Sequence, residues 1–396
     1  MAGATPWVLS TYFAEGLPYS IVHQLSALLF TYLGASLGAV GRTSLYQFAW
    51  NAKFAWSPLV DRYKTPRAWL VGAELVLAAL CFAIAIPAGR GDVPGVARLL
   101  VAFAVAAATH DIAIDGFYLH ALDKGGQAAL SGLRVAAYRA AMFVGSSLLV
   151  MLAGVTSWAW PFLVAGAAFV VLAVAHALFL PRVAPEGRGG QSGGARPPMV
   201  DAFVSFLRQP NMALSLPFIV LFKAGDALMF NMNAPFLKSL GFQALGSGAL
   251  SGASTLASIV GTLVGGALLA RGAFRRVLLP VAAMQSAAIL LYVALASTAA
   301  PSTATITAVL VAEKLVAGFG DAALLVFIMR RCERTHRAAH FAIASALMSL
   351  PLSLVGLFAG ELAGAVGFAR FFLVAFGASL PGVALAAFVP KGDVND

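Results

Sequence analysis

The stretch Thr109-His110-Asp111-Ile112-Ala113-Ile114-Asp115-Gly116-Phe117-Tyr118 places two carboxylates four residues apart inside an otherwise apolar run. Four residues make about one helical turn, so Asp111 and Asp115 lie on the same face of a helix. An ionised aspartate near the centre of a bilayer costs about 2.5 to 3.5 kcal/mol on insertion scales, so this face should not contact lipid. We expect it to line a wet cavity or a protein interior. A structural ion pair between helices is the alternative interpretation.

The composition places this stretch in a membrane. Of 396 residues, 60% are hydrophobic and 11% are charged, whereas soluble domains carry roughly 25% charged residues. A net charge of +10 would suggest nucleic acid as the partner of a soluble protein, but the basic residues here lie between apolar runs. We expect membrane lipids around the chain and no nucleic-acid partner. Cys81 and Cys332 show no metal or redox spacing, so neither a disulfide nor a metal site is expected.

Twelve segments are long and apolar enough to span a bilayer, which takes about 20 largely apolar residues. They are 7–34, 41–60, 67–87, 95–121, 128–155, 158–180, 211–239, 244–270, 274–298, 303–331, 339–365 and 367–389. The sequence therefore predicts an all-α polytopic membrane protein with twelve transmembrane helices in two six-helix bundles. The predicted parts are an N-terminal bundle (1–181), a polar, glycine-rich, flexible cytoplasmic linker (182–208) and a C-terminal bundle with a short tail (209–396).

The distribution of arginine and lysine predicts the orientation of these segments. The connections that follow even-numbered segments, together with the tail, carry most of the basic residues found between segments. Cytoplasmic connections are enriched in arginine and lysine. Both termini should therefore be cytoplasmic.

The two halves of the sequence resemble each other. Phe13-Ala14-Glu15-Gly16 is similar to Phe222-Lys223-Ala224-Gly225 at an offset of 209 residues, and Asp111 meets Asp321 at an offset of 210. Many secondary transporters are built from such internal repeats. The near-constant offset predicts a duplication that gives Asp111 and Asp321 equivalent positions.

Acidic residues concentrate in the first, fourth, seventh and tenth segments, which begin each three-helix repeat. These acids are Glu15, Asp111, Asp115, Asp226, Glu313 and Asp321. The first helix of each repeat lines the central cavity in a twelve-helix, two-bundle transporter. We predict that Asp111, Asp115 and Glu15 take part in proton coupling, and that Asp226 and Asp321 contribute to substrate binding.

Five bases also lie inside predicted segments: Lys53, Arg134, Arg139, Lys223 and Lys314. Helical spacing predicts the pairs Lys223–Asp226 and Lys314–Asp321, and an arginine of the fifth segment could neutralise Asp111 or Asp115. All five are candidate substrate-binding residues, and the alternative is that they only balance buried acids. A guanidinium binds carboxylate or phosphate through two hydrogen bonds, which favours a functional role for Arg134.

The other candidate substrate-binding residues are polar or aromatic: His23, Tyr118 and Asn233. Glu15, Tyr19 and His23 repeat every four residues and so share one helix face. Aromatic rings beside polar groups suit sugar rings, although an aromatic stripe is more often packing. His23 could relay protons, although a buried neutral histidine is more often a packed residue.

The sequence carries no phosphate-binding loop, no His-Glu-x-x-His and no Gly-x-Ser-x-Gly. We therefore expect a secondary active transporter without a cofactor, acting as a monomer on a small molecule and driven by an ion gradient. A polytopic membrane enzyme such as an acyltransferase, and a lipid flippase without ion coupling, are the alternatives.

Three motifs carry a resemblance to a known family: Glu15-Gly16-Leu17-Pro18-Tyr19, the run Lys53-Phe54-Ala55-Trp56-Ser57-Pro58-Leu59-Val60-Asp61-Arg62-Tyr63, and His110-Asp111-Ile112-Ala113-Ile114-Asp115. Together they resemble the AmpG-type muropeptide permeases and the related acetyl-CoA transporters of the major facilitator superfamily. These motifs cover the first third of the chain, and the remainder matches in hydropathy and repeat. His110 stands where the family commonly has glutamine.

The resemblance implies the major facilitator fold and an inner-membrane symporter that imports anhydromuropeptides with protons. It also implies that the Asp-x-x-x-Asp pair matters for transport. Shorter relatives include permeases thought to import siderophores, so a siderophore or another small molecule is the alternative cargo.

Asp111 and Asp115 in the fourth predicted segment give a specific hypothesis for proton coupling. Two carboxylates one turn apart in a low-dielectric cavity repel each other, which favours a proton on one of them unless Arg134 or Arg139 offsets the charge. We predict that Asp111 is paired with an arginine and that Asp115 carries the proton.

Overall fold

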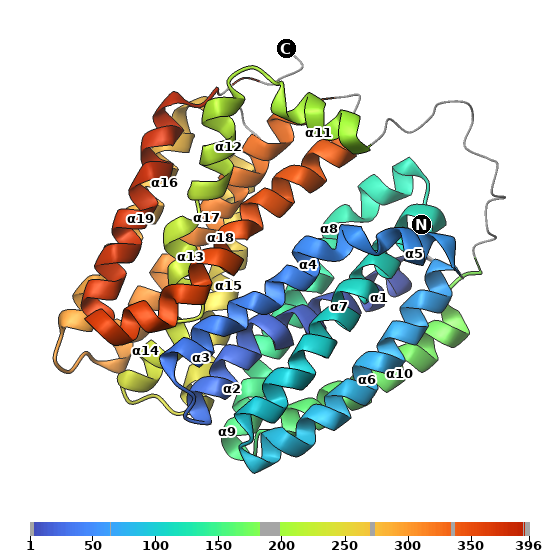
Figure 1. The fold of residues 1–396 in the computed structure, drawn as a ribbon, viewed down its shortest axis with the longest axis horizontal. Coiled ribbons are helices and arrows are strands. Elements are labelled where there is room, and N and C mark those ends of the chain that lie inside the picture. The colour runs from blue at the N-terminus through green and yellow to red at the C-terminus, as the bar shows by residue number, and fades with distance from the viewer. Residues whose placement is uncertain are drawn as a thin grey trace. The chain divides into compact units, whose positions relative to one another are not determined.

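A computed structural model describes residues 4–63, 65–182, 199–269, 274–333, 337–390 and 392, and Figure 1 shows its helices. No strand occurs in these ranges. The helices of the N-terminal half are α1 (Thr5–Ser20), η1 (Ile21–Leu25), α2 (Ser26–Tyr32), α3 (Leu37–Gly41), η2 (Arg42–Gln47), α4 (Phe48–Ala52), η3 (Lys53–Ala55), α5 (Ser57–Arg62), α6 (Pro66–Arg90), α7 (Val93–Ala121), α8 (Lys124–Phe143), η4 (Val144–Leu148), α9 (Leu149–Val155) and α10 (Ala159–Phe179).

The helices of the C-terminal half are α11 (Met199–Leu207), α12 (Met212–Leu221), α13 (Ala224–Phe230), α14 (Asn233–Ser239), α15 (Ala244–Leu268), α16 (Phe274–Ser297), α17 (Thr303–Arg330), α18 (Arg337–Val366) and α19 (Phe368–Phe388). Each of the twelve expected spans corresponds to one of these helices or to a run of short ones. By length and composition alone, nine helices in the described ranges could cross a membrane.

The three expected spans outside those nine contain the interruptions and polar residues that matter for the site. Residues 5–32 carry Glu15 and His23, and a π-helical turn, η1, interrupts the α-helix there. Residues 37–62 alternate between α and 3-10 helix, and Pro58 lies in the first turn of α5, where it cannot donate a backbone hydrogen bond. The helix α17 carries Glu313, Lys314 and Asp321.

Part of the predicted linker is helical. The prediction of a flexible stretch over 182–208 is wrong for Met199–Leu207, which forms α11, whereas 183–198 lie outside the described residues. The helix forms because it can bury one apolar face: Phe206 is fully buried in the core that includes Phe218, Phe274 and Phe327.

The chain divides into two compact units. Unit 1 comprises 1–36, 45–191 and 237–252, and unit 2 comprises 37–44, 192–236 and 253–396. In unit 1, α6 packs against α7 and α10, and α1 packs against α7 and α8. In unit 2, α16 packs against α17 and α19, and α13 packs against α18 and α19.

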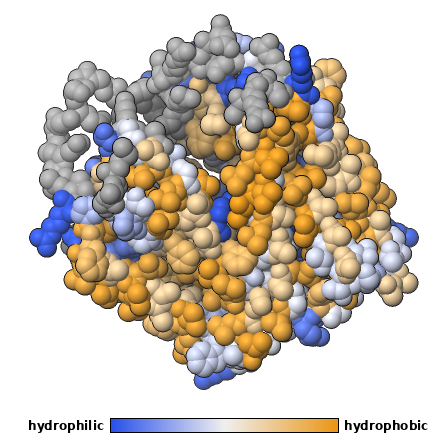
Figure 2. All heavy atoms as spheres, turned by 180° about the vertical axis from the view of Figure 1, so that it is seen from behind, coloured by the Kyte–Doolittle hydropathy of each residue, from blue (hydrophilic) through white to orange (hydrophobic). Residues whose placement is uncertain are grey.

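Much of the apolar surface is exposed. Leu178 and Phe179 at the end of α10 are 68% and 80% exposed, and Phe388 at the end of α19 is 72% exposed. Figure 2 shows a face on which apolar side chains predominate. Exposed apolar surface on this scale is typical of helices that face lipid.

A glycine brings α1 close to α8 within unit 1. A Cβ atom on Gly16 would lie 2.5 Å from the Tyr138 carbonyl oxygen and 3.0 Å from the Ala141 side chain. Only glycine permits so close an approach of the two backbones. The contact brings the helix that carries Glu15 against the helix that carries Arg134.

Candidate functional site

Five charged side chains of unit 1 form a group that we call the amino-terminal charge cluster: Glu15 on α1, Lys53 on η3, Asp111 and Asp115 on α7, and Arg134 on α8. The Lys53 ammonium donates to Asp111 Oδ2. The Arg134 Nη2 atom lies 2.9 Å from Asp115 Oδ1. The two aspartates of α7 are therefore both paired, each with a base from a different helix.

The predicted pairing is confirmed in one part and wrong in another. An arginine of the fifth predicted segment does neutralise one aspartate of the motif, because Arg134 pairs with Asp115. The predicted arginine beside Asp111 is wrong, because the partner of Asp111 is Lys53. Arg139, one turn further along α8, makes no ion pair with any acid in the described ranges. Asp111 and Asp115 lie one turn apart on the same face of α7. Each therefore contacts a base from a different neighbouring helix.

Two tyrosines hold Arg134 in place. Tyr12 donates a hydrogen bond of 2.9 Å to Asp115 Oδ1, and the guanidinium lies 4.4 Å from the centre of the Tyr12 ring. It also lies 5.6 Å from the centre of the Tyr118 ring, whose hydroxyl donates to the Gln127 carbonyl oxygen at 2.6 Å. These contacts orient the cation by its attraction to the ring faces as well as by its ion pair.

Glu15 is the carboxyl group of this cluster without a base of its own. Its side chain is 7% exposed, and Oε2 is buried without a hydrogen-bond partner among the described residues. Lys53 and Arg134 are close enough to influence it electrostatically, but each already pairs with an aspartate. The cluster thus holds three carboxyl groups and two paired bases.

An aromatic group lies further along the same helix. Ring centres are separated by 4.3 Å between Tyr19 and His23, by 5.4 Å between Tyr19 and Trp50, and by 5.1 Å between His23 and Trp50. His23 is buried, and its Nε2 has no hydrogen-bond partner in the described part of the chain. The π-helical turn η1 presents His23 towards these rings.

Unit 2 contains a second group of charges, the carboxyl-terminal charge cluster, formed by Lys223, Asp226, Gln285 and Asp321. The Lys223 ammonium lies 2.7 Å from Asp226 Oδ2 and 2.8 Å from Asp321 Oδ1. Gln285 Nε2 donates to Asp226 Oδ2 at 2.6 Å. Lys223 lies at the break between α12 and α13, where it also donates to the Ala317 carbonyl oxygen at 3.3 Å.

The predicted pair Lys223–Asp226 is confirmed, and the predicted pair Lys314–Asp321 is wrong. Lys314 lies 3.1 Å from Glu313 Oε2, an atom that also accepts a hydrogen bond of 3.3 Å from Tyr292. The partner of Asp321 is Lys223. Sequence separation on α17 favoured Lys314, whereas Lys223 reaches Asp321 from another helix.

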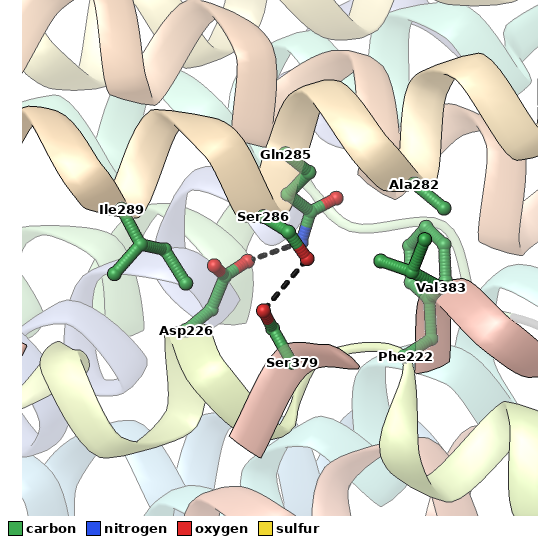
Figure 3. Close-up of a pocket in the computed structure, with 8 residues that line it drawn as sticks. All are labelled: Phe222, Asp226, Ala282, Gln285, Ser286, Ile289, Ser379 and Val383. Atoms are coloured by element: carbon green, nitrogen blue, oxygen red, sulfur yellow. Dashed lines mark hydrogen bonds between the residues drawn. The ribbon is translucent and has the colours of Figure 1, made fainter. Parts of the chain in front are cut away.

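A narrow pocket without room for a water molecule adjoins Asp226. Figure 3 shows its polar side, where Gln285 points to Asp226 and Ser286 donates to Ser379 at 2.6 Å. The remaining lining is apolar and comes from Phe222, Ala282, Ile289 and Val383. The predicted residue Asn233 does not line this pocket, and its Oδ1 is buried without a partner among described residues.

Sequence reasoning missed Tyr12 and Gln285, which contact the predicted aspartates. Tyr12 lies three residues before Glu15 and therefore on a neighbouring position of the same face. Gln285 is a lone amide in a long apolar segment, which is a signal that could have identified it.

The sequence of the chain matches the Major Facilitator Superfamily over residues 8–312. The anhydromuropeptide permease of Escherichia coli K12 is 29% identical over 94% of this chain and 77% of that protein. A protein of Rickettsia felis described as a putative transporter, AmpG 4, is 22% identical over 95% of this chain and 94% of its own length.

Solved structures show the same fold. A nucleoside transporter, NupG, in a D323A mutant, superposes with a TM-score of 0.76 at 16% identity, over 98% of this chain and 100% of that one. A bacterial homologue of the lysosomal transporter Spinster, in an inward-facing and unoccupied conformation, gives a TM-score of 0.67 at 14% identity, over 97% and 94% of the two chains. Because the family model covers most of its length, the chain belongs to the major facilitator superfamily as an AmpG-like, multi-pass membrane transporter.

Proposed function

We propose that this transporter is a proton-coupled symporter that imports an anhydromuropeptide across the inner membrane. The observation that carries the proposal is the charge balance of the amino-terminal charge cluster, in which three carboxyl groups share two bases and Glu15 is buried without a base of its own. Uncompensated charge is costly inside a membrane, and carboxyl groups in such places commonly carry protons. The cluster is neutral when it holds one proton.

Glu15 is the proton carrier in this proposal. Asp111 and Asp115 remain ionised against Lys53 and Arg134, so the third carboxyl group is the one that gains and loses a proton. This assignment replaces the sequence-based hypothesis that Asp115 carries the proton. Release of the proton leaves the cluster with a net charge of −1, a state favoured when the site opens to water.

The substrate class rests on chemistry that the residues of unit 1 can supply. A muropeptide combines sugar rings with peptide carboxylates. The rings of Tyr19, His23 and Trp50 offer apolar faces for a sugar. Arg134 could bind a substrate carboxylate, because a guanidinium holds a carboxylate through two hydrogen bonds and this one remains partly exposed beside Asp115. The similarity to the E. coli permease supports the same substrate class.

The experiment is uptake of a labelled anhydromuropeptide into proteoliposomes that contain the purified full-length chain. An inward-directed proton gradient should drive accumulation, and a protonophore should abolish it. Accumulation that is unaffected by the protonophore would contradict proton coupling. Uptake of a second solute, such as a siderophore, with which unlabelled muropeptide does not compete would contradict the substrate class.

The orientation proposed here has both termini in the cytoplasm, with the chain acting as a monomer. The two native cysteines, Cys81 and Cys332, are buried, so they give little background labelling. A cysteine placed at the exposed Asp201 of α11 should react with a membrane-impermeant maleimide only after the cells are opened. Labelling of Asp201→Cys in intact right-side-out vesicles would show that α11 lies on the outer side of the membrane and would contradict the proposed orientation.

A further inference from the structure

A second group of titratable side chains lies in unit 1, outside the amino-terminal charge cluster. It consists of Glu74 on α6, His110 on α7 and His176 on α10, and Ser10 of α1 completes it. We call it the histidine cluster. Glu74 and His110 are both 0% exposed, and His176 is 3% exposed. The proposed transport mechanism does not use these side chains.

Hydrogen bonds connect this cluster in a chain across three helices. His176 Nδ1 lies 2.7 Å from Glu74 Oε1, and His176 Nε2 lies 2.9 Å from Ser10 Oγ. The Ser10 hydroxyl is also 3.2 Å from the Trp7 carbonyl oxygen. The chain therefore accommodates two protonation states of His176. A neutral ring accepts from Ser10, whereas a doubly protonated ring donates to it and Ser10 then donates to Trp7.

Charge balance favours the doubly protonated ring beside an ionised Glu74. A carboxylate removed from water needs a cation or a proton. In the described part of the chain, the basic side chains beside Glu74 Oε1 are His176, at 2.7 Å, and His110, at 3.6 Å. An ionised Glu74 therefore needs a proton on one of these two imidazoles.

His110 is a second ring of this cluster that could hold the proton. His110 Nε2 lies 3.6 Å from Glu74 Oε1, beyond hydrogen-bond distance, and neither nitrogen of His110 has a partner in the described ranges. Glu74 Oε2 is likewise buried without one. A small rotation of the His110 ring would allow a protonated Nε2 to donate to Glu74, so each histidine can neutralise the same carboxylate.

We propose that Glu74, His110 and His176 form an intramembrane proton-binding site that is separate from the amino-terminal charge cluster. The ligand is a proton that resides on one of the two imidazoles and is stabilised there by the ionised Glu74 carboxylate. The site is connected to the transport residues through the backbone, since α7 carries His110 next to Asp111, and α1 carries both Ser10 and Glu15. The proposal stands independently of the substrate and of the carrier role of Glu15.

The test is a pH titration of the full-length chain in lipid, with histidine ring nitrogens labelled with ¹⁵N and observed by magnetic resonance. The chain has six histidines, and His110→Gln and His176→Gln assign the two relevant signals. In the wild type, at least one of the two rings should be cationic at neutral pH. Glu74→Gln should make both rings neutral at that pH, because it removes the carboxylate that stabilises the cation.

The matched control is His120→Gln, which changes the same residue type on the same helix at an exposed position. It should leave the signals of His110 and His176 unchanged. A second variant, Ser10→Ala, keeps the Glu74–His176 contact and tests the proposal even if Glu74→Gln does not fold. It should change the ring-nitrogen signals of His176 but not those of His120. Two neutral rings in the wild type from about pH 5 to 8, or a titration unchanged by Ser10→Ala, would overturn the proposal.

Discussion

Arg134 and Asp115 form an ion pair of 2.9 Å, and Tyr12 donates to the carboxylate oxygen that the guanidinium contacts. Both charged side chains remain more than one third exposed. A pair of this kind is held in place by its neighbours but is open to a competing carboxylate. This combination suits a residue that binds substrate and returns to an internal partner after release.

Glu15→Gln should abolish accumulation driven by a proton gradient while leaving exchange of substrate between equal solutions largely intact. The glutamine imitates the protonated carboxyl group, so the substrate site remains, but no proton can be carried. Counterflow and gradient-driven uptake measured on the same proteoliposomes separate the two effects. Glu361→Gln is the control, because Glu361 is half exposed and pairs with Arg42. If Glu15→Gln accumulated substrate as the wild type does, the transported proton would be carried by a group other than Glu15.

Asp115→Asn should impair both exchange and accumulation, in contrast to Glu15→Gln. The substitution removes the carboxylate that Arg134 contacts and that Tyr12 also donates to. Because the pair is partly exposed, we expect a loss of roughly 1 to 3 kcal/mol in stability, between the values for surface and buried pairs. Thermal unfolding in detergent measures this loss. A variant that exchanges substrate normally but cannot accumulate it would restore Asp115 as the proton carrier.

Most spanning helices could be located in the sequence because nine of them, in the described ranges, are long apolar runs. The segment 66–90 is an example: Thr65 caps the helix at its N-terminus, and Gly91, in a left-handed conformation, ends it. The helix α11 escaped prediction because it is short and lies in a polar, glycine-rich context, and tertiary burial of Phe206 stabilises it.

The charged members of the candidate site could also be predicted, because charged residues stand out in an apolar sequence. Most of the pairs that they form across helices could not be predicted. Spacing along one helix identified Lys223–Asp226 but not Lys223–Asp321, since the second contact joins two helices far apart in the sequence. Helical periodicity contains no information on which helix packs opposite, so Lys53 as the partner of Asp111 could only be found in the structure.

Gly16→Ala should destabilise unit 1 by about 1 to 3 kcal/mol, the cost of overpacking a close contact. The added methyl group would lie 2.5 Å from the Tyr138 carbonyl oxygen, so α1 and α8 must separate. Gly72→Ala is the matched control, because nothing lies within 4 Å of its Cβ position and alanine favours the helix. Thermal unfolding compares the two. Equal stability of both variants would show that the α1–α8 contact is looser than described.

Lys223→Met should destabilise unit 2 strongly, because one ammonium serves two carboxylates there. The Lys223 side chain is 16% exposed. Its removal takes away the ammonium that lies within 2.8 Å of both Asp226 and Asp321. Breaking a buried pair from one side costs about 3 to 5 kcal/mol.

The double variant Lys223→Met, Asp226→Asn should recover part of that loss, because only Asp321, which is 42% exposed and partly hydrated, then remains charged. Asparagine can still accept from Gln285, so the hydrogen bond at Asp226 survives the change. Unfolding temperatures of the single and double variants, with Asp226→Asn alone as the reference, give the coupling between the two positions. If the double variant were no more stable than Lys223→Met, charge balance would not explain the role of the lysine, and its contact with the Ala317 carbonyl oxygen would carry the effect instead.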